Sequence, residues 1–365
     1  MNIPLFKPYI TNDEFVAVQR TMKSGKLTRG NEVETFEKEF AQYVKKKFAI
    51  AVNSGTSGLH VAVRALGWRK GDEVITTPFS YISSSNALLY ENVTPVFVDI
   101  DPHTLNIDPG KIEEKITNNT KGIMAVHILG LPVAFNPLMK IKEKYGFQII
   151  EDACEAIGRP SEHFNVSTLG DISVYGFHEN KQITTLGEGG MIVTDNRDLA
   201  EICRSMRDQG RSTTKEWIKN VILGFNFRMT EAQAAFGREQ LKKIDKMLAR
   251  RRDIAQRYSV LLEDVKNITI PVIESSERSW FVYYIILDDP SIRAQVVNKL
   301  NKANICTSTN YFPPIYNFPM YRGSNRVCIH SESISERLLV LPMYYEMKND
   351  EIDRVVSELK KALSY

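Results

Sequence analysis

The segment QIIEDACEAIG, residues 148–158, carries a short apolar run, a pair of carboxylates and a closing glycine. The run Gln148–Glu151 predicts a buried strand, with Asp152 directly beyond it. Carboxylates this close to a core need partners, because an unpaired buried charge is costly. A metal ion is one such partner and a protonated ring nitrogen is another. No histidine or third carboxylate stands nearby at ligand spacing, so we expect no metal here.

Six further strands of this kind flank the segment. Their near-continuous Val, Ile and Phe content is typical of strands covered on both faces. They are Phe48–Asn53, Glu73–Thr77, Pro95–Asp99, Gly122–His127, Ile172–Phe177 and Met191–Thr194, and helical patterns lie between them at Ser57–Leu66, Ile82–Tyr90, Pro109–Ile116 and Asn136–Tyr145. This alternation predicts an α/β layer fold with a mostly parallel sheet. Ligands of such sheets bind beyond the C-terminal ends of the strands.

The rest of the chain predicts a smaller α+β unit. A long helix is expected over Thr230–Leu262, and it is followed by a strand over Trp280–Leu287 and by helices over Ser291–Ala303 and Asp350–Leu363. A length of 365 residues favours two domains over one. We place the large domain at residues 1–245 and the small domain at residues 246–365. The triplet Arg250-Arg251-Arg252 is expected to form a solvated face of the long helix.

The composition is that of an ordinary globular chain. Hydrophobic residues make up 43% and charged residues 25%, which excludes a disordered or fibrous protein. The net charge of +3 gives no reason to expect nucleic acid or a membrane as a partner. Four separated cysteines without a C-x-x-C pair predict neither a metal site nor disulfides, and they fit a cytoplasmic location. We expect no signal peptide and no membrane-spanning segment.

The segment Asn53–Gly58, NSGTSG, predicts an anion-binding turn between a strand and a helix. Small residues let the backbone approach a ligand, while exposed N–H groups and the helix dipole favour an anion. Ser54, Thr56 and Ser57 add hydroxyl donors around Gly55. An ordinary helix N-cap is the alternative interpretation.

A lysine, Lys181, follows another buried strand in the segment FHENK, residues 177–181. A partly buried amine at that place is a candidate for Schiff-base chemistry. Tyr81, after the strand Glu73–Thr77, offers an aromatic face to a planar ligand. Together with the anion turn and a carboxylate for a pyridinium nitrogen, Asp152, these groups meet the requirements of pyridoxal phosphate.

The chain resembles the DegT/DnrJ/EryC1/StrS family of sugar aminotransferases, and the resemblance covers almost its whole length. The matching motifs are SGKLTRG (24–30), SGTSGLH (54–60), GDEVITTPFSY (71–81), PVFVDIDPHTLNID (95–108), EDACEAIG (151–158), FHENKQITTLGEGG (177–190), GFNFRMTEAQAA (224–235) and LPMYYEM (341–347). The resemblance implies a fold-type I pyridoxal phosphate enzyme, similar to aspartate aminotransferase. That fold has a mostly parallel large domain and a smaller α+β C-terminal domain.

The resemblance also assigns roles to residues. It implies that Lys181 is the lysine that binds the cofactor covalently and that Asp152 faces the pyridine nitrogen. It places Tyr81 against the ring and the Ser54–Ser57 turn, with Gly55 and Thr56, at the phosphate. Asn226 matches an asparagine that reaches the phosphate site of a neighbouring subunit, which implies a homodimer with shared active sites. We also predict that His178, Arg228 and Tyr311 bind substrate.

Two positions in the cofactor site depart from the family pattern. Gly176 stands five residues before the lysine, where the family usually has a phosphate-binding serine. Glu155 stands three residues after the aspartate, where many members have Gln or His. Enzymes that resemble perosamine synthase can carry Glu there, so the chain is similar to that branch, which aminates a 4-keto-6-deoxy sugar on GDP.

These features predict transfer of an amino group from an amino acid, expected to be L-glutamate, to a keto sugar on a nucleotide. A role in polysaccharide or O-antigen biosynthesis, or in making glycosides, would follow. Two alternatives remain open: a nucleotide-sugar dehydratase of the same fold, and a non-catalytic protein that binds a ligand in this fold. Dehydratases that resemble this family have histidine at the position of Lys181, and a scaffold has no need of Lys181 and Asp152 together.

Overall fold

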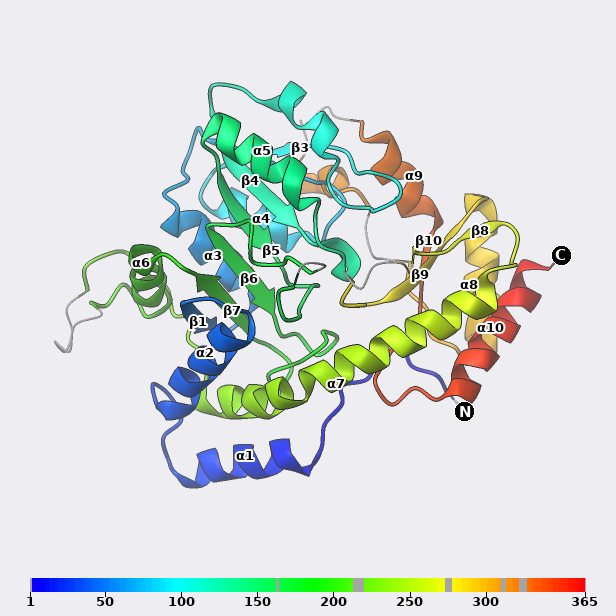
Figure 1. Ribbon diagram of the computed structural model, residues 1–365, viewed down its shortest axis with the longest axis horizontal. Helices are drawn as coiled ribbons and strands as arrows, with labels where there is room; N and C mark the ends of the chain where they lie inside the picture. The colour runs from blue at the N-terminus through cyan, green and yellow to red at the C-terminus, as the bar shows by residue number, and fades with distance from the viewer. Residues whose placement is uncertain are drawn as a thin grey trace.

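A seven-stranded sheet forms the centre of the computed structural model, which describes residues 2–161, 164–212, 220–272, 278–309, 313–321 and 327–364 (Figure 1). The strand order is β1-β7-β6-β5-β4-β2-β3. The strands are β1 (Phe48–Val52), β2 (Glu73–Thr76), β3 (Thr94–Phe97), β4 (Thr120–Val126), β5 (Gln148–Asp152), β6 (Ile172–Gly176) and β7 (Gly190–Thr194). Only β7 pairs antiparallel with its neighbours within this sheet, so the prediction of a mostly parallel sheet is confirmed.

Helices bury both faces of this sheet, which explains the continuous apolar runs. In β4, Met124 and Val126 belong to one hydrophobic cluster, while Ile123 and Ala125 belong to another on the opposite face. The helices of this part are α3 (Gly55–Ala65), α4 (Ser83–Tyr90), α5 (Phe135–Tyr145) and α6 (Arg197–Arg207). Helix α3 packs against β6 and β7, so its N-terminus lies at their edge of the sheet.

Two N-terminal helices that the sequence analysis did not predict, α1 (Asn12–Lys23) and α2 (Asn31–Tyr43), pack on α7 (Glu231–Leu262). The buried carboxylate of Glu231 accepts hydrogen bonds from three backbone N–H groups at the start of α2. The donors are Gly30 at 2.7 Å, Glu32 at 2.8 Å and Val33 at 3.4 Å. Glu231 therefore supplies the acceptors that the first turn of α2 lacks.

A second, three-stranded sheet lies at the other end of α7 (Figure 1). Its order is β10-β9-β8, all antiparallel, from β8 (Ile268–Thr269), β9 (Tyr283–Leu287) and β10 (Leu338–Leu341). Its helices are α8 (Arg293–Lys302), α9 (Ile329–Arg337) and α10 (Asn349–Leu363). This is the smaller α+β part that the sequence predicted. The proposed boundary at residue 245 falls inside the continuous helix α7.

Two local predictions were wrong. Residues 109–116 form two short 3₁₀ turns, Pro109–Lys111 and Glu113–Lys115, instead of a helix. The Asp108 carboxylate accepts the Gly110 N–H at 2.9 Å, and this local bond competes with helix formation. Arg251 is not on a solvated face, because it is 5% exposed.

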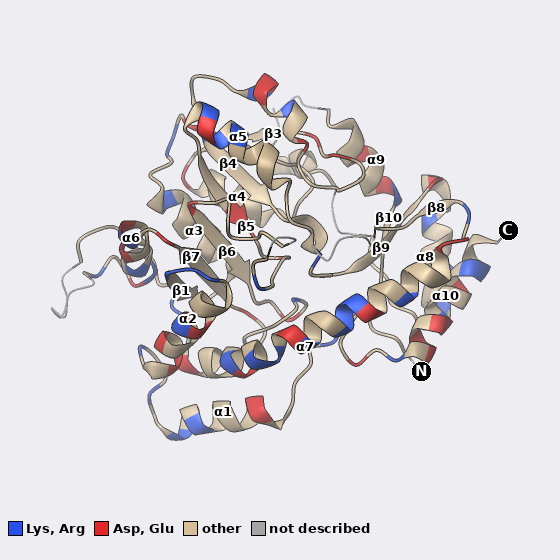
Figure 2. Cartoon of the chain, viewed as in Figure 1, with Lys and Arg blue, Asp and Glu red and all other residues tan. Residues whose placement is uncertain are grey.

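Charged residues of both signs alternate along the outer helices, as Figure 2 shows for α7 and α10. The sheet strands are almost free of them in the same view. This distribution agrees with the small net charge of the sequence. Within the described ranges, no helix combines the length and the apolarity that crossing a membrane requires.

Replacing Glu231 by alanine is expected to lower the free energy of unfolding by about 3 kcal/mol, because three N–H groups lose a charged acceptor in a buried place. Urea unfolding measures the change. The control is Glu263→Ala, which removes an exposed carboxylate at the C-terminal end of the same helix. Equal stability of the two variants would contradict the capping role of Glu231.

Candidate active site

A cavity of about 350 Å³ opens where β5 and β6 end and α3 begins. This volume lies in the range of small-molecule sites. Nine predicted site residues line it: Ser54, Gly55, Thr56, Tyr81, Asp152, Glu155, Gly176, His178 and Lys181. Ser57, Asn226 and Arg228 are not among its lining residues, and Tyr311 lies outside the described residues. Lining residues that the sequence analysis missed include Ser80, Ser83, Cys154, Asn180 and Ser308.

The N-terminus of α3 provides one wall of the cavity. Ser54 is the N-cap, and its side chain accepts the Ser57 N–H at 3.1 Å and contacts the Ser57 hydroxyl at 2.9 Å. Ser57 is therefore used inside the cap, which explains why it does not line the cavity. The first N–H groups of the helix, at Gly55 and Thr56, have no acceptor within the helix and favour an anion. Thr56 also bonds to Ser83, at 2.8 Å, at the start of α4.

Glycines bring backbone close to this wall. A Cβ on Gly190 would lie 2.6 Å from the carbonyl oxygen of Ser54, and one on Gly55 would lie 2.8 Å from Cys154 Sγ. At Gly176 a Cβ would lie 3.2 Å from both Cβ and Sγ of Cys154. The Cys154 side chain thus occupies space beside Gly176, and this gives a steric reason for the absence of the serine that the family pattern has there.

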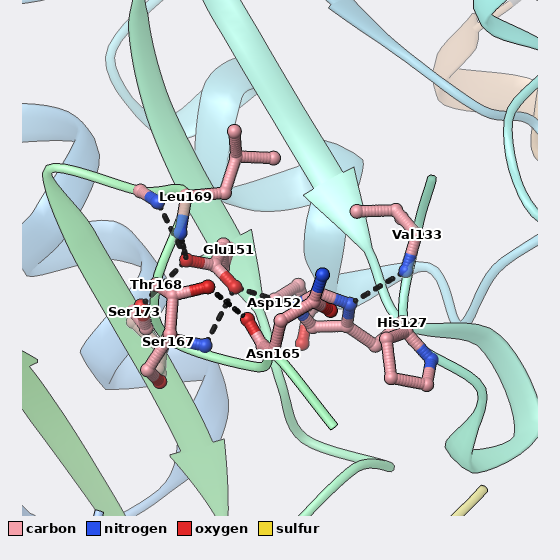
Figure 3. A network of polar contacts seen from close by, with 12 residues as sticks. His127, Val133, Glu151, Asp152, Asn165, Ser167, Thr168, Leu169 and Ser173 are labelled. Atoms are coloured by element: carbon pink, nitrogen blue, oxygen red, sulfur yellow. Dashed lines mark hydrogen bonds and ion pairs between the residues drawn. The ribbon is translucent and has the colours of Figure 1, made fainter. Parts of the chain in front are cut away.

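The two carboxylates at the end of β5 point to opposite faces of the sheet, as alternation along a strand requires. Glu151 is fully buried beside His127, 2.8 Å from its Nε2 (Figure 3). His127 Nδ1 accepts the Val133 N–H at 3.1 Å, so the ring carries its proton on Nε2 and donates it to Glu151. The other donors to Glu151 are the N–H groups of Ser167, Leu169 and Gly170 and the hydroxyl of Ser173.

Glu151 is therefore a structural carboxylate. Burial raises its pKa, but the hydrogen bonds from His127 and from the loop N–H groups outweigh burial and hold the pKa below its ordinary value. A charged group that is satisfied on every side has no capacity left for a ligand.

Asp152, on the other face, is the carboxylate that reaches the cavity. It is 5% exposed, and Ser84 donates its hydroxyl to Oδ2 at 2.6 Å. The backbone N–H of Cys154 donates to Oδ1 at 3.1 Å. Burial, followed by the charge of Asp152, raises the pKa of the Cys154 thiol well above its usual range, so this cysteine stays protonated. Asp152 is thus held in one orientation as the acidic group of the cavity floor.

Lys181 lies between a carboxylate and an aromatic ring. Its Nζ is 3.6 Å from Glu155 Oε1 and 4.1 Å from the centre of the Phe281 ring. Glu155 Oε2 accepts the Leu129 N–H at 2.8 Å. Burial raises the pKa of Glu155 above its ordinary value, and the Lys181 ammonium and the Leu129 N–H offset only part of this rise. Glu155 and Phe281 thereby hold the Lys181 amine at the cavity, and Leu129 in turn holds Glu155.

Phe281 itself is positioned by the long helix. Arg251 donates from Nη1 to the carbonyl oxygens of Trp280, at 3.2 Å, and of Phe281, at 3.1 Å. Trp280 has a φ of 49°, a left-handed conformation that a bulky residue adopts only where its surroundings enforce it. The sequence analysis missed Arg251, although its spacing from Met247, Ile254 and Tyr258 places it on the buried face of the helix.

Four other predicted residues occupy distinct places. Tyr81 is 66% exposed on the cavity rim, where its ring is open to a planar ligand. His178 lines the cavity and contacts Asn180 Oδ1 at 2.9 Å through Nδ1. Arg228 is engaged away from the cavity, bonding to Asp208 at 2.6 Å. Asn226 is exposed on the strand-like segment that pairs with Asp208.

Residues 8–360, almost the whole chain, match one protein-family model. The model describes the DegT/DnrJ/EryC1/StrS aminotransferase family. The chain belongs to this family. It is a pyridoxal phosphate-dependent enzyme of the sugar aminotransferase type, as the sequence analysis predicted. The Gly55 and Gly190 cradle, the open helix terminus and the amine at Lys181 fit that cofactor.

Three relatives illustrate the family. The chain is 38% identical to a GDP-perosamine synthase from Caulobacter vibrioides, over 92% of this chain and 91% of the relative. It is 33% identical to a 3-oxo-glucose-6-phosphate:glutamate aminotransferase from Bacillus subtilis, over 96% and 81%. Among solved structures, NtdA from Bacillus subtilis with bound cofactor PMP superimposes with a TM-score of 0.91 at 32% identity, covering 98% of this chain and 83% of the other. The fold-type prediction is confirmed.

The raised pKa of Glu155 predicts a pH dependence of stability. The folded chain holds this proton more tightly than the unfolded chain does. The stabilisation is therefore complete below the ordinary pKa of 4.5 and is lost as the pH rises through the raised value. The stability difference between wild type and Glu155→Gln should fall as the pH rises from 4.5 towards neutrality.

Urea unfolding of protein freed of cofactor, over that pH range, measures this difference. Glu179→Gln, which alters an exposed carboxylate in the loop before Lys181, is the control and should show no such trend. A flat difference for Glu155→Gln would show that this carboxyl ionises normally in the folded chain.

Proposed function

We propose that this protein transfers an amino group from L-glutamate to a keto carbon of a nucleotide-linked hexose, with a 4-keto-6-deoxyhexose favoured. The observation that supports this best is the position of Lys181. Its amine lies at the cavity within 3.6 Å of Glu155, while Asp152 lines the same cavity. The Caulobacter relative is named for a GDP sugar, which supports the nucleotide-linked acceptor. The Bacillus relative is named for glutamate, which supports the donor, although its named acceptor is a sugar phosphate.

Each residue has a distinct part in this reaction. When bound, pyridoxal phosphate supplies an electron-accepting ring that stabilises negative charge on the carbon next to the amine. Asp152, held by Ser84, keeps a proton on the ring nitrogen, because a buried carboxylate favours a charged partner. Lys181 would hold the cofactor covalently, and its amine, when free, would carry a proton to and from the reacting carbon. Tyr81, exposed on the cavity rim, would offer its aromatic face to the cofactor.

The phosphate end of the cofactor is assigned to the start of α3. Gly55 and Thr56 offer N–H groups, and Ser54 and Thr56 offer hydroxyls. Gly176 brings no side-chain donor. Ser57, which the sequence analysis placed at the phosphate, is assigned instead to the cap of this turn. His178 is assigned to substrate recognition from the cavity wall. Arg228 and Tyr311 keep the same predicted role, Arg228 from outside the cavity lining of its own chain.

The two alternatives remain weaker. A dehydratase of this fold fits poorly because Lys181 is present, and a ligand-binding scaffold gives no role to a lysine held beside Glu155. We further propose a homodimer with shared active sites, in which Asn226 serves the partner subunit, and a cytoplasmic role in polysaccharide, O-antigen or glycoside biosynthesis. The exposed position of Asn226, outside its own cavity, supports a function towards another subunit.

A coupled assay tests the reaction. Purified protein is supplied with pyridoxal phosphate, L-glutamate and a keto sugar on GDP, dTDP or UDP, and the release of 2-oxoglutarate is measured. We expect turnover with a 4-keto-6-deoxy sugar. Water loss from the sugar without 2-oxoglutarate would favour the dehydratase, and the absence of any reaction or visible cofactor absorbance would favour the scaffold.

The change Lys181→Ala should reduce turnover at least about 100-fold, because loss of a general acid–base group costs about 10²–10⁴-fold. Steady-state rates at saturating substrate measure the loss. Lys140→Ala, at an exposed position of α5, should leave the rate unchanged. More than a hundredth of the wild-type rate in Lys181→Ala would refute the assigned role.

Hybrid dimers test the shared site. Mixing Lys181→Ala chains with Asn226→Ala chains gives one site with both lesions and one with neither, so activity should rise above that of either parent. Subunit exchange is checked by native mass spectrometry with one parent tagged. No gain despite confirmed exchange would show that Asn226 acts within its own chain, and a fully active Asn226→Ala parent would exclude the phosphate role.

A further inference from the structure

Arg278 is a buried cation, and two of its three guanidinium nitrogens lack an acceptor among the residues that the structure describes. Its side chain belongs to a residue that is 4% exposed, and neither Nε nor Nη1 has a hydrogen-bond partner within the described ranges. A guanidinium keeps its charge at all ordinary pH values, so it cannot escape this position by losing a proton. Burying such a charge without a counter-charge is unfavourable.

The contacts that Arg278 does make are with aromatic rings. Its Cζ lies 5.2 Å from the centre of the Trp280 ring and 5.6 Å from that of Tyr284. Aromatic faces attract a cation and leave its N–H groups in the ring plane free to donate. The rings therefore hold the guanidinium in place and leave its hydrogen-bonding capacity unused.

Arg278 is not among the residues that line the active-site cavity, but its chain segment contacts a residue that is. Three residues farther along, the Phe281 ring contacts Lys181 Nζ at 4.1 Å. Tyr284 lies in β9, and the neighbouring strand β10 pairs with Ser308, which lines the cavity. The chain segment of Arg278 and the strand of Tyr284 are thus each connected to a residue that lines the cavity, Lys181 and Ser308 respectively.

The backbone around Arg278 is fixed. The residue after it, Ser279, accepts a hydrogen bond from Gln182 Nε2 at 3.0 Å, and its N–H donates to the Gly130 carbonyl at 2.9 Å. Trp280 is held in its left-handed conformation by Arg251. Strain of this kind is retained where a group must be held ready before a ligand arrives.

We propose that Arg278 recognises an oxyanion of the substrates, either a carboxylate of the amino-acid donor or a phosphate of the sugar nucleotide. An oxyanion would satisfy the unpaired N–H groups and neutralise the buried charge, and guanidinium is the side chain best suited to both anions. The identity of the ligand rests on the proposed function, whereas the existence of the site does not.

Isothermal titration of the pyridoxal phosphate-loaded protein tests the site without turnover. The probes are glutarate, a dicarboxylate with no amino group to transfer, and inorganic pyrophosphate, with the cofactor's own phosphate site already filled. Arg278→Gln should weaken binding of at least one probe about 10- to 100-fold, the effect of losing hydrogen bonds from a charged group. Arg252→Gln, at an exposed position of α7, is the matched control and should bind as wild type.

The two probes separate the sources of the anion. Weaker binding of glutarate alone assigns the donor carboxylate, weaker binding of pyrophosphate alone assigns the sugar nucleotide, and a loss of both indicates a site that serves both substrates. Unchanged affinity for both probes, or no measurable binding of either by the wild type, overturns the proposal. These results stand even if the coupled assay detects no amino transfer.

Thermal unfolding distinguishes recognition from a structural role. A buried guanidinium that lacks acceptors lowers the stability of the ligand-free protein. Removing it in Arg278→Gln should therefore leave the melting temperature at the wild-type value or raise it. A lower melting temperature with unchanged probe affinity would show that the guanidinium serves the fold, and would overturn the proposal. Arg278→Lys keeps the charge but not the planar donors. It should retain part of the affinity, and it replaces the glutamine variant in the titration if that variant does not fold.

Discussion

The carboxylate of Glu151 is the contact on which the geometry of the active site depends. It is fully buried and accepts hydrogen bonds from His127 and from the loop that follows residue 166. These bonds fix the end of β5 against β4 and the loop before β6. Because neighbouring residues of a strand face opposite ways, fixing Glu151 on one side of the sheet also fixes Asp152 on the other. The hydrogen bonds to Glu151 on one face of the sheet thus help to orient Asp152, which faces the cavity on the other face.

The rest of the site is assembled from distant parts of the chain. The α3 terminus and the ends of β5 and β6 come from the large sheet, while Phe281 and Ser308 come from the part around the small sheet. The segment around Ser279 is the junction, since it bonds to Gly130 and Gln182. Lys181 therefore contacts both parts, and a movement between them would change the surroundings of its amine.

The sequence predicted the structure well where a local pattern is compatible with only one kind of element. Continuous apolar runs predicted every strand of the large sheet to within about two residues, because strands buried on both faces leave no room for polar positions. The rule that ligands of a parallel sheet bind beyond the C-terminal ends of its strands led to Asp152 and Lys181. The sequence analysis predicted no helix before residue 48, where α1 and α2 lie. It predicted a helix over Pro109–Ile116, where the Asp108 carboxylate instead accepts the N–H of Gly110 in a short turn.

Other parts of the site depend on tertiary contacts that no local pattern reports. Ser84 orients Asp152 from a helix 68 positions earlier in the chain. Phe281 contacts Lys181 from a backbone segment that Arg251 holds through the carbonyls of Trp280 and Phe281. The roles assigned to the individual site residues stay predictions, including those of Lys181, Asp152, Asn226 and Tyr311.

The contact between Gly176 and Cys154 couples the two positions sterically. A Cβ at residue 176 would meet the thiol side chain at 3.2 Å, so a serine there and a cysteine at 154 compete for the same space. A larger side chain at either position must be accommodated by a small shift of the other side chain. The free-energy effects of substitutions at residues 154 and 176 are therefore not expected to be additive.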